Sequence, residues 1–302
     1  MIPEFPRFKT LELSDKEEVE KITAKYPPYS DFNFVSMWCW DIKGEMRISL
    51  LNNNLVVKFT DYLTGNPFFS FLGDNMVNET AETLLKCSIE DELKPKLFLV
   101  SENIISKLDG NKFRVDEDID NFDYIFDLKE VSEYSGSQFI KKRNKVKQLL
   151  KSFPNIKVLP INIQDKDIEE KILKLDELWA NNKIQEDISF RTRNEFLATK
   201  RFFESKIHFD DIFSLGVFLD DELIGYSIFS ILGNDYALSH FAKADIKFVG
   251  IYDFLIRECA KMLREQQCSF LNYEQDLGLP GLRVSKKSFM SKYLKKFAVG
   301  FI

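Results

Sequence analysis

The residues best suited to act together chemically lie in one short stretch near the C-terminus, NYEQDLGLPGLRVSKKSF, from Asn272 to Phe289. Glu274 and Asp276 supply two carboxylates, and Arg283 and Lys286 lie about one helical turn apart. The stretch follows an apolar run, so we expect it to leave the carboxyl end of a buried strand, where open α/β sheets bind ligands. Either carboxylate, Glu274 or Asp276, could act as a general base, and Arg283 or Lys286 could hold an anionic substrate group. Alternatively, the acids cap the following helix and pair with Arg283.

Residues of neighbouring elements are expected to line the same cleft. Asn272 ends the strand before Glu274, Lys243 ends the strand in YALSHFAKAD, and Tyr252 begins the next helix. These three residues are substrate-binding candidates. His240 lies in the middle of its strand and is a catalytic candidate, because the ordinary pKa of histidine suits proton transfer near pH 7. A lone histidine on a strand can equally be a core residue with one hydrogen bond.

Two further segments are rich in groups that contact ligands. PYSDFNFVSMWCWD offers Tyr29 and Asp31 for substrate binding, or else forms an apolar plug between domains. A basic helix is predicted over GSQFIKKRNKVKQLLKSFPN, with Phe139, Val146, Leu149 and Leu150 on one face. Its cations, including Lys142 and Arg143, could bind phosphates of a tRNA, a nucleotide or an anionic membrane surface. A solvated helix face is the alternative.

Other classes of function lack support in the sequence. There is no GxSxG, P-loop, GxGxxG or HExxH motif, and the two histidines, His208 and His240, are too few for a histidine-rich metal site. Cys39 and Cys259 are predicted to be core residues. The net charge of -6 argues against a general polyanion binder. We see no signal peptide and no apolar run long enough to span a membrane, so we expect a cytoplasmic protein.

The predicted elements indicate an α+β fold with mixed sheets. The first half reads as helix, hairpin through Asn52 to Asn54, strand, helix and two more strands, at residues 96–100 and 122–128. The second half reads as strand, two helices, a hairpin through Asp220 to Glu222, strand, helix, strand, helix and a last strand at residues 298–302. An antiparallel meander that leads into one strand–helix–strand crossover predicts a mixed sheet flanked by helices.

This order resembles the acyl-CoA N-acyltransferase (GNAT) fold. The motifs PYSDFNFVSMWCWD, KKRNKVKQLLKSFPN, HFAKAD…GIYDFLIRE and NYEQDLGLPGLRVSKKSF are similar to those of a bacterial family grouped with the C-terminal domain of phosphatidylglycerol lysyltransferases. The resemblance implies two tandem GNAT-like domains, residues 1–130 and 131–302, with the site in the second domain and a degenerate first domain. It also implies an acyl- or aminoacyl-transferase acting on an amine or hydroxyl acceptor, such as a small molecule or a lipid amine. A non-catalytic ligand-binding module on the same scaffold is the alternative.

The expected donor is acyl-CoA or aminoacyl-tRNA. A typical acetyl-CoA loop holds the pyrophosphate through several small residues at a helix N-terminus. Here the corresponding loop, DIKFVGIYDF, has only Gly250, and Tyr252 stands where a second small residue would lie. This departure disfavours ordinary acetyl-CoA binding and leaves aminoacyl-tRNA or another acyl donor open.

Overall fold

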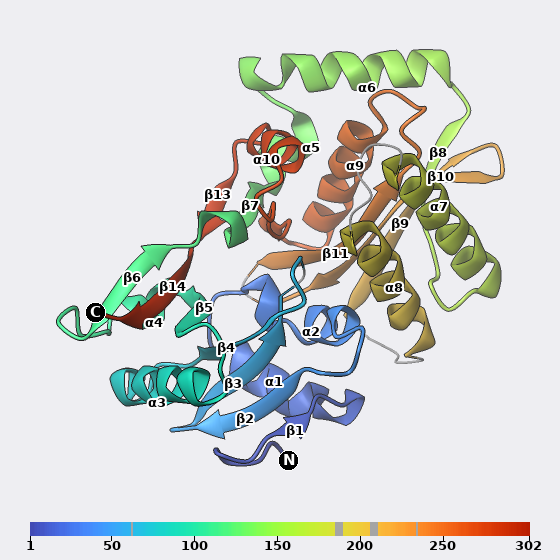
Figure 1. The fold of residues 1–302 in the computed structure, drawn as a ribbon. Coiled ribbons are helices and arrows are strands. Elements are labelled where there is room, and N and C mark those ends of the chain that lie inside the picture. Colours follow the sequence, from blue (N-terminus) through green and yellow to red (C-terminus); the bar gives the residue numbers. More distant parts are fainter. Residues whose placement is uncertain (62, 185–189, 206–210, 234) are drawn as a thin grey trace. The chain divides into compact units, whose positions relative to one another are not determined.

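The computed structural model describes residues 1–61, 63–184, 190–205, 211–233 and 235–302, so His208 lies outside the described residues. The chain forms two compact units, shown with their elements in Figure 1. The first comprises Met1–Tyr124, Gln275–Val284 and Tyr293–Ile302, and the second comprises Ile125–Glu274 and Ser285–Lys292. The boundary expected near residue 130 between tandem domains stays a prediction.

The first unit contains two sheets. One has the order β1 (Lys9–Thr10), β2 (Arg47–Leu51), β3 (Asn54–Thr60), β4 (Pro67–Leu72), with antiparallel pairing throughout. The β2–β3 turn is the predicted hairpin, since Asn52 and Asn53 have φ angles of 54° and 60°, which asparagine tolerates. The other sheet has the order β5 (Lys96–Ser101), β14 (Lys296–Phe301), β6 (Phe113–Glu117).

Helix α3 (Val77–Glu90) links β4 to β5 and supplies the core between strands. Its Ala81, Leu84 and Leu85 are buried against the strands, as helical spacing predicts, but Ile89, which the same spacing places with them, is 54% exposed. The predicted C-terminal strand is present as β14, and it forms the middle strand of the first unit's three-stranded sheet. The remaining helices of this unit are α1 (Lys16–Thr23), α2 (Phe34–Trp40) and α4 (Glu102–Ile105).

The second unit is built on one mixed sheet. Its strands follow the order β13 (Lys292–Leu294), β7 (Asp123–Asp127), β12 (Phe270–Asn272), β11 (Tyr236–Ala244), β10 (Glu222–Ile231), β9 (Ile212–Leu219), β8 (Ile156–Pro160). Strands β11 and β12 pair in parallel and are joined by the crossover helix α9 (Ile251–Glu265). The pairs β7–β12, β11–β10, β10–β9 and β9–β8 are antiparallel, which confirms the predicted mixed, mostly antiparallel sheet.

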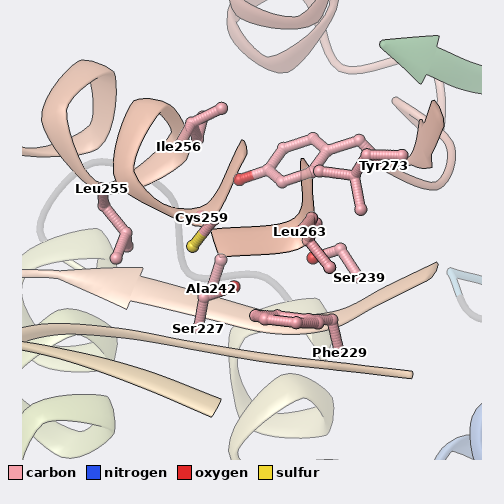
Figure 2. A pocket seen from close by; sticks show the side chains of 10 residues that line it. Ser227, Phe229, Ser239, Ala242, Leu255, Ile256, Cys259, Leu263 and Tyr273 are labelled. Carbon is pink, nitrogen blue, oxygen red and sulfur yellow. The ribbon is translucent and has the colours of Figure 1, made fainter. Parts of the chain in front are cut away.

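Helices cover both faces of this sheet. Two consecutive residues of β10 point to opposite faces. The Tyr226 hydroxyl donates to Asp176 of α7 (Lys166–Ile184), whereas Ser227 lies beside residues of α9 (Figure 2). Helix α8 (Phe190–Glu204) packs on α7, while α5 (Leu128–Glu133) and α6 (Ile140–Ser152) pack on α9. Where the chain passes between the units it forms α10 (Pro280–Lys287) and β13 (Lys292–Leu294). Within the described residues, no helix combines the length and apolar character needed to cross a bilayer.

The basic helix is present as α6, with two corrections to its predicted faces. Phe139, Val146 and Leu149 are buried, but Leu150 is 37% exposed and does not belong to the apolar stripe. Lys142 is only 9% exposed and lies on the buried side. Cys39 and Cys259 are buried, as predicted.

Candidate active site

Strand β11 carries two irregularities that open the second unit's sheet. It pairs with β12 over only three residues, Tyr236 to Leu238, and then runs on to Ala244 without that neighbour. On its other edge the register steps from Phe229↔Ser239 to Ile228↔Phe241, so His240 is an extra, bulged residue. Bulges re-aim side chains and are common beside active sites. The residues of β11 beyond Leu238 therefore lie outside the pairing with β12, next to a bulge that re-aims side chains.

His240 itself is a buried, uncharged residue. Its Nε2 lies 2.8 Å from the Ser230 hydroxyl oxygen, and burial lowers the pKa of the ring to about 3. A neutral ring with a hydrogen bond is the core arrangement that the sequence left open. At pH 7 this histidine carries no proton to donate as an imidazolium.

Lys243, at the end of β11, belongs to a buried charged cluster. Its side chain is 13% exposed and forms an ion pair with Glu195 of α8, and its Nζ lies 4.0 Å from the centre of the Trp179 ring. Burial alone would lower the pKa of Lys243, but the carboxylates of Glu195 and Asp176 outweigh it, so the pKa is raised. Lys243 is thus a permanent ammonium inside the unit.

Asp176 of α7 is the second acid of this cluster, and one of its oxygens is open. The carboxyl is 2% exposed, and Oδ1 accepts a hydrogen bond of 2.5 Å from the Tyr226 hydroxyl. Oδ2 has no hydrogen-bond partner among the described residues. The nearby Thr199 hydroxyl donates to the Glu195 carbonyl at 3.2 Å, and its closeness to Asp176 acts to lower the pKa of that acid. Burial raises the pKa of Asp176, with the charge of Lys243 opposing.

The cluster can therefore accept one more cation or donor. With Asp176, Glu195 and Lys243 all ionised, two negative charges face one positive charge. A buried acceptor without a partner costs free energy, which a bound donor would recover. An ammonium group, with three donors and one positive charge, matches both the open oxygen and the excess charge.

Lys243 was predicted from the sequence as a site residue, but its partners Asp176 and Glu195 were not. Asp176 does leave a signal: it occupies the fourth position after Ile172 on the apolar stripe of α7, three residues before Trp179. A carboxylate on the apolar stripe of a helix faces the core and must be buried with polar or charged partners. Its position on the stripe therefore indicates a buried polar cluster. Glu195, on a different helix, carries no such signal.

The start of α9, where the sequence suggested a donor phosphate site, is already covered. Gly250 caps the helix with a φ of 92°, and a Cβ there would lie 2.9 Å from the Lys145 carbonyl oxygen. In the first turn, Asp253 accepts a hydrogen bond of 2.7 Å from Lys142. The carboxylate of Asp253 thus supplies the negative charge that a helix N-terminus favours.

The two cations proposed for phosphate binding have structural partners. Besides Asp253, Lys142 has its ammonium 3.4 Å from the centre of the Phe289 ring, and burial lowers its pKa. Arg143 donates to the backbone carbonyls of Tyr134 and Gly136, the latter at 2.7 Å. Both side chains thus hold helix α6 in place.

The other candidates of the second unit hold the turns near the sheet opening. The Tyr252 hydroxyl accepts from the Ala244 backbone N–H at 3.2 Å. Asn272 is fully buried, and its Oδ1 accepts from the Glu274 N–H at 2.9 Å. The buried Lys286 donates to the Tyr273 carbonyl. Lys286 therefore secures backbone after β12.

Asp276 and Arg283 lie in the first unit, so Glu274 and Asp276 belong to different units although they are two residues apart. Arg283 binds both Asp276 oxygens, at 2.7 Å each, and the Tyr124 hydroxyl also donates to this carboxylate. Burial alone would raise the pKa of Asp276, but these donors outweigh it and the pKa is lowered. The Asp276–Arg283 ion pair is the structural pairing that the sequence analysis gave as the alternative to a catalytic site.

Tyr29 and Asp31 belong to a second buried network of the first unit. The Tyr29 hydroxyl accepts from the Glu102 N–H at 3.1 Å. Asp31 accepts from Lys296 and, at 2.7 Å, from Gln275. Lys296 is completely buried and also donates to Asp123 at 2.7 Å.

Ser30 satisfies the rest of that network. Its N–H and hydroxyl donate to the two oxygens of Asp123, at 2.8 Å and 2.7 Å. Each carboxylate oxygen of Asp31 and Asp123 thus has a partner. The network joins all three chain segments of the first unit, and no group of three or more metal-binding side chains occurs among the described residues.

The fold and sequence are similar to those of a known family. A family model described as the C-terminal domain of phosphatidylglycerol lysyltransferase matches residues 23–300. A conserved protein of unknown function from Bacteroides thetaiotaomicron superposes with a TM-score of 0.83 at 21% identity, over 100% of both chains. No curated protein sequence matches the chain.

Two solved structures carry the family name itself. The C-terminal DUF2156 domain of a protein from Agrobacterium fabrum, assigned as a lysylphosphatidylglycerol synthetase, gives a TM-score of 0.65 at 12% identity, over 95% of this chain and 90% of that one. L-PGS from Bacillus licheniformis gives 0.60 at 11% identity, over 99% and 93%. The family model covers nearly the whole chain, so the protein belongs to the family of phosphatidylglycerol lysyltransferase C-terminal domains.

Proposed function

We propose that this protein is an acyl- or aminoacyl-transferase whose second unit binds an acceptor amine at Asp176. The observation that carries the proposal is the open Oδ2 of Asp176 in a buried cluster with one excess negative charge. The family, named for an aminoacyl transfer, supports the reaction class.

The cluster has the groups that amine acylation needs. The amine enters as an ammonium and must lose two protons as its nitrogen forms the new bond to the acyl carbon. One proton goes to Asp176, whose pKa burial raises and which is therefore a stronger base than an exposed carboxylate, and the other goes to the leaving oxygen or sulfur of the donor. Lys243, held as an ammonium by Glu195, stabilises negative charge on the carbonyl oxygen.

The donor that best fits is aminoacyl-tRNA. The start of α9 is covered by the Lys145 backbone and carries the charge of Asp253, which disfavours a CoA pyrophosphate there. The ester of an aminoacyl-tRNA has no need of this site. The same covered helix start also favours the second candidate, a non-catalytic module that binds an amine without transferring anything to it.

Transfer is tested with lysyl-tRNA, alanyl-tRNA and acetyl-CoA as separate donors and pentylamine as a minimal acceptor, with products followed by mass spectrometry. We expect an amide product from a charged tRNA and a loss of at least tenfold in Asp176→Asn. The matched control is Asp253→Asn, which removes another acid of the same unit, partly buried and paired with Lys142. Amine binding without product from any donor would favour the non-catalytic module. If the protein shows no amine binding and no product, both the transferase and the non-catalytic module are rejected.

A further inference from the structure

Strand β6 forms one end of the three-stranded sheet of the first unit, beside β14 (Figure 1). Its pairing with β14 is continuous and has no bulge. The Asp118 N–H donates to the Lys296 carbonyl at 2.9 Å, and the Ile302 N–H donates to the Lys112 carbonyl at 3.2 Å. Because ladder bonds alternate along an antiparallel strand, the even-numbered residues of β6 direct their backbone groups toward β14. The odd-numbered residues direct theirs away from the sheet.

These outward groups form an open edge. The Phe113 N–H donates to the Asp109 carbonyl at 3.1 Å, but the outward N–H and C=O groups of Val115 and Glu117 have no partner within the described residues. Edge strands are commonly protected by proline, by a bulge or by charged side chains. Strand β6 has neither proline nor bulge, and its charged side chains are of both signs. The order of those signs therefore decides which strand can pair with this edge.

The charges of β6 complement those of a second copy of the same strand. When two copies run antiparallel about a two-fold axis at Val115, Arg114 of each copy lies opposite Asp116 of the other. These residues then form non-hydrogen-bonded pairs, in which side chains approach most closely, so their opposite charges stabilise the pairing. An axis at Arg114 or at Asp116 would instead set two arginines or two aspartates opposite each other. The sequence of charges therefore favours one register.

The same register satisfies the open backbone groups. Val115 of each copy would exchange two hydrogen bonds with Val115 of the other, and the Glu117 N–H would donate to the Phe113 carbonyl. Val115 and Phe301 are exposed and project from one face of the sheet, because Phe301 pairs with Phe113, two residues before Val115. Pairing would bring the two copies of Val115 together and cover part of this apolar face.

We infer that β6 pairs with β6 of a second copy of this chain, which joins two three-stranded sheets into one continuous sheet. The Arg114 side chain is 71% exposed and already bonds to Asp116 of its own strand at 3.1 Å. Its guanidinium has further N–H groups for the carboxylate of the other copy. An edge that its charges keep free is the competing explanation, and it predicts a monomer. The inference concerns the first unit and does not depend on the proposed function.

The experiment measures the mass of the full chain by sedimentation equilibrium over a range of protein concentrations. We expect a reversible dimer whose association weakens as salt is added. Arg114→Asp and Asp116→Arg should each weaken the self-association about tenfold or more, because like charges then face each other in both cross-strand pairs. Mixing the two variants should restore a heterodimer, since a strand with two acids then meets a strand with two arginines.

Two variants of Val115 provide the control. Val115→Pro removes an N–H that points away from β14 and should abolish the dimer, whereas Val115→Thr keeps that N–H and should retain it. The charge reversals change exposed side chains, so they decide the question even if Val115→Pro fails to fold. A wild-type chain that stays monomeric at every concentration would overturn the inference. So would a dimer that survives both charge reversals, or a mixture of the two variants that stays monomeric.

Discussion

Each of the two units buries a lysine beside two carboxylates, but the hydrogen bonding of the carboxylate oxygens differs between them. In the first unit Lys296 is fully buried, and every oxygen of Asp31 and Asp123 has a donor. In the second unit Lys243 keeps 13% of its side chain exposed, and Asp176 retains an open oxygen. The satisfied network joins chain segments, whereas the open one has capacity for a ligand. Similar residue types therefore form a satisfied structural network in one unit and, in the other, the cluster that we propose binds an amine.

Removing each lysine should separate the two units most strongly. Lys296→Met leaves two buried carboxylates without their cation and should cost about 3–5 kcal/mol of unfolding free energy. Lys243→Met should cost less, because that side chain is partly exposed and has a single ion-pair partner. Urea denaturation followed by circular dichroism measures both. The exposed neighbour Lys295→Met is the control and should change little. Equal losses for Lys296 and Lys243 would contradict the comparison.

Removing one acid from each network separates a structural carboxylate from a functional one. Asp123→Asn replaces an acceptor of three hydrogen bonds and should destabilise the protein by about 2–3 kcal/mol. Asp176→Asn removes an excess buried charge and should be neutral or slightly stabilising, as is common at functional sites. Thermal and urea unfolding of both variants tests this. Strong destabilisation by Asp176→Asn would make it a structural acid like Asp123.

The dependence of the unfolding free energy on acidic pH should report on His240, which is neutral in the folded protein. Its folded pKa of about 3 lies below the ordinary value of 6.5, so the unfolded chain binds the proton first. Stability is therefore full above pH 6.5 and falls as the pH drops toward 3, by about 1.4 kcal/mol per pH unit. His240→Gln should flatten the slope in this window. An unchanged slope in urea melts at pH 6, 5 and 4 would show that His240 is not the titrating group.

The smallest expected effect concerns the ring beside Lys243. Trp179→Leu removes the cation–π contact while keeping an apolar side chain, and should weaken the cluster by about 0.5–1 kcal/mol. Trp179→Phe, which keeps an aromatic face, should recover part of that loss. Urea melts of the two variants provide the measurement, and identical values would assign the loss to packing alone.

Local patterns predicted most of the fold. The Asn52–Asn53 hairpin, the apolar stripe of α9 and the β11–α9–β12 crossover each depend on residues close in sequence. The pairing of β14 with β5 and β6 does not, because it joins residues about 180–200 positions apart, such as Lys296 and Ser101. No local pattern specifies which sheet a last strand enters.

The candidate site was less predictable for the same reason. Lys243 stood out at a strand end, but Asp176 and Glu195 reach it from two helices about 50–70 residues earlier. The acids that drew attention, Glu274 and Asp276, are neighbours in sequence and belong to different units. Residue types and spacing in the sequence indicated candidate site residues. Whether a carboxylate oxygen is left without a hydrogen-bond donor depends on tertiary packing, which the sequence does not show.

Binding of an ammonium group by Asp176 is the central claim for the second unit. The decisive measurement is isothermal titration calorimetry of pentylamine against pentan-1-ol, which differ only in the ammonium, on wild type, Asp176→Asn and Asp253→Asn. We predict saturable binding of the amine, no binding of the alcohol, at least tenfold weaker amine binding in Asp176→Asn, and no change in Asp253→Asn. Equal binding of amine and alcohol, or amine binding that survives Asp176→Asn, would contradict the account.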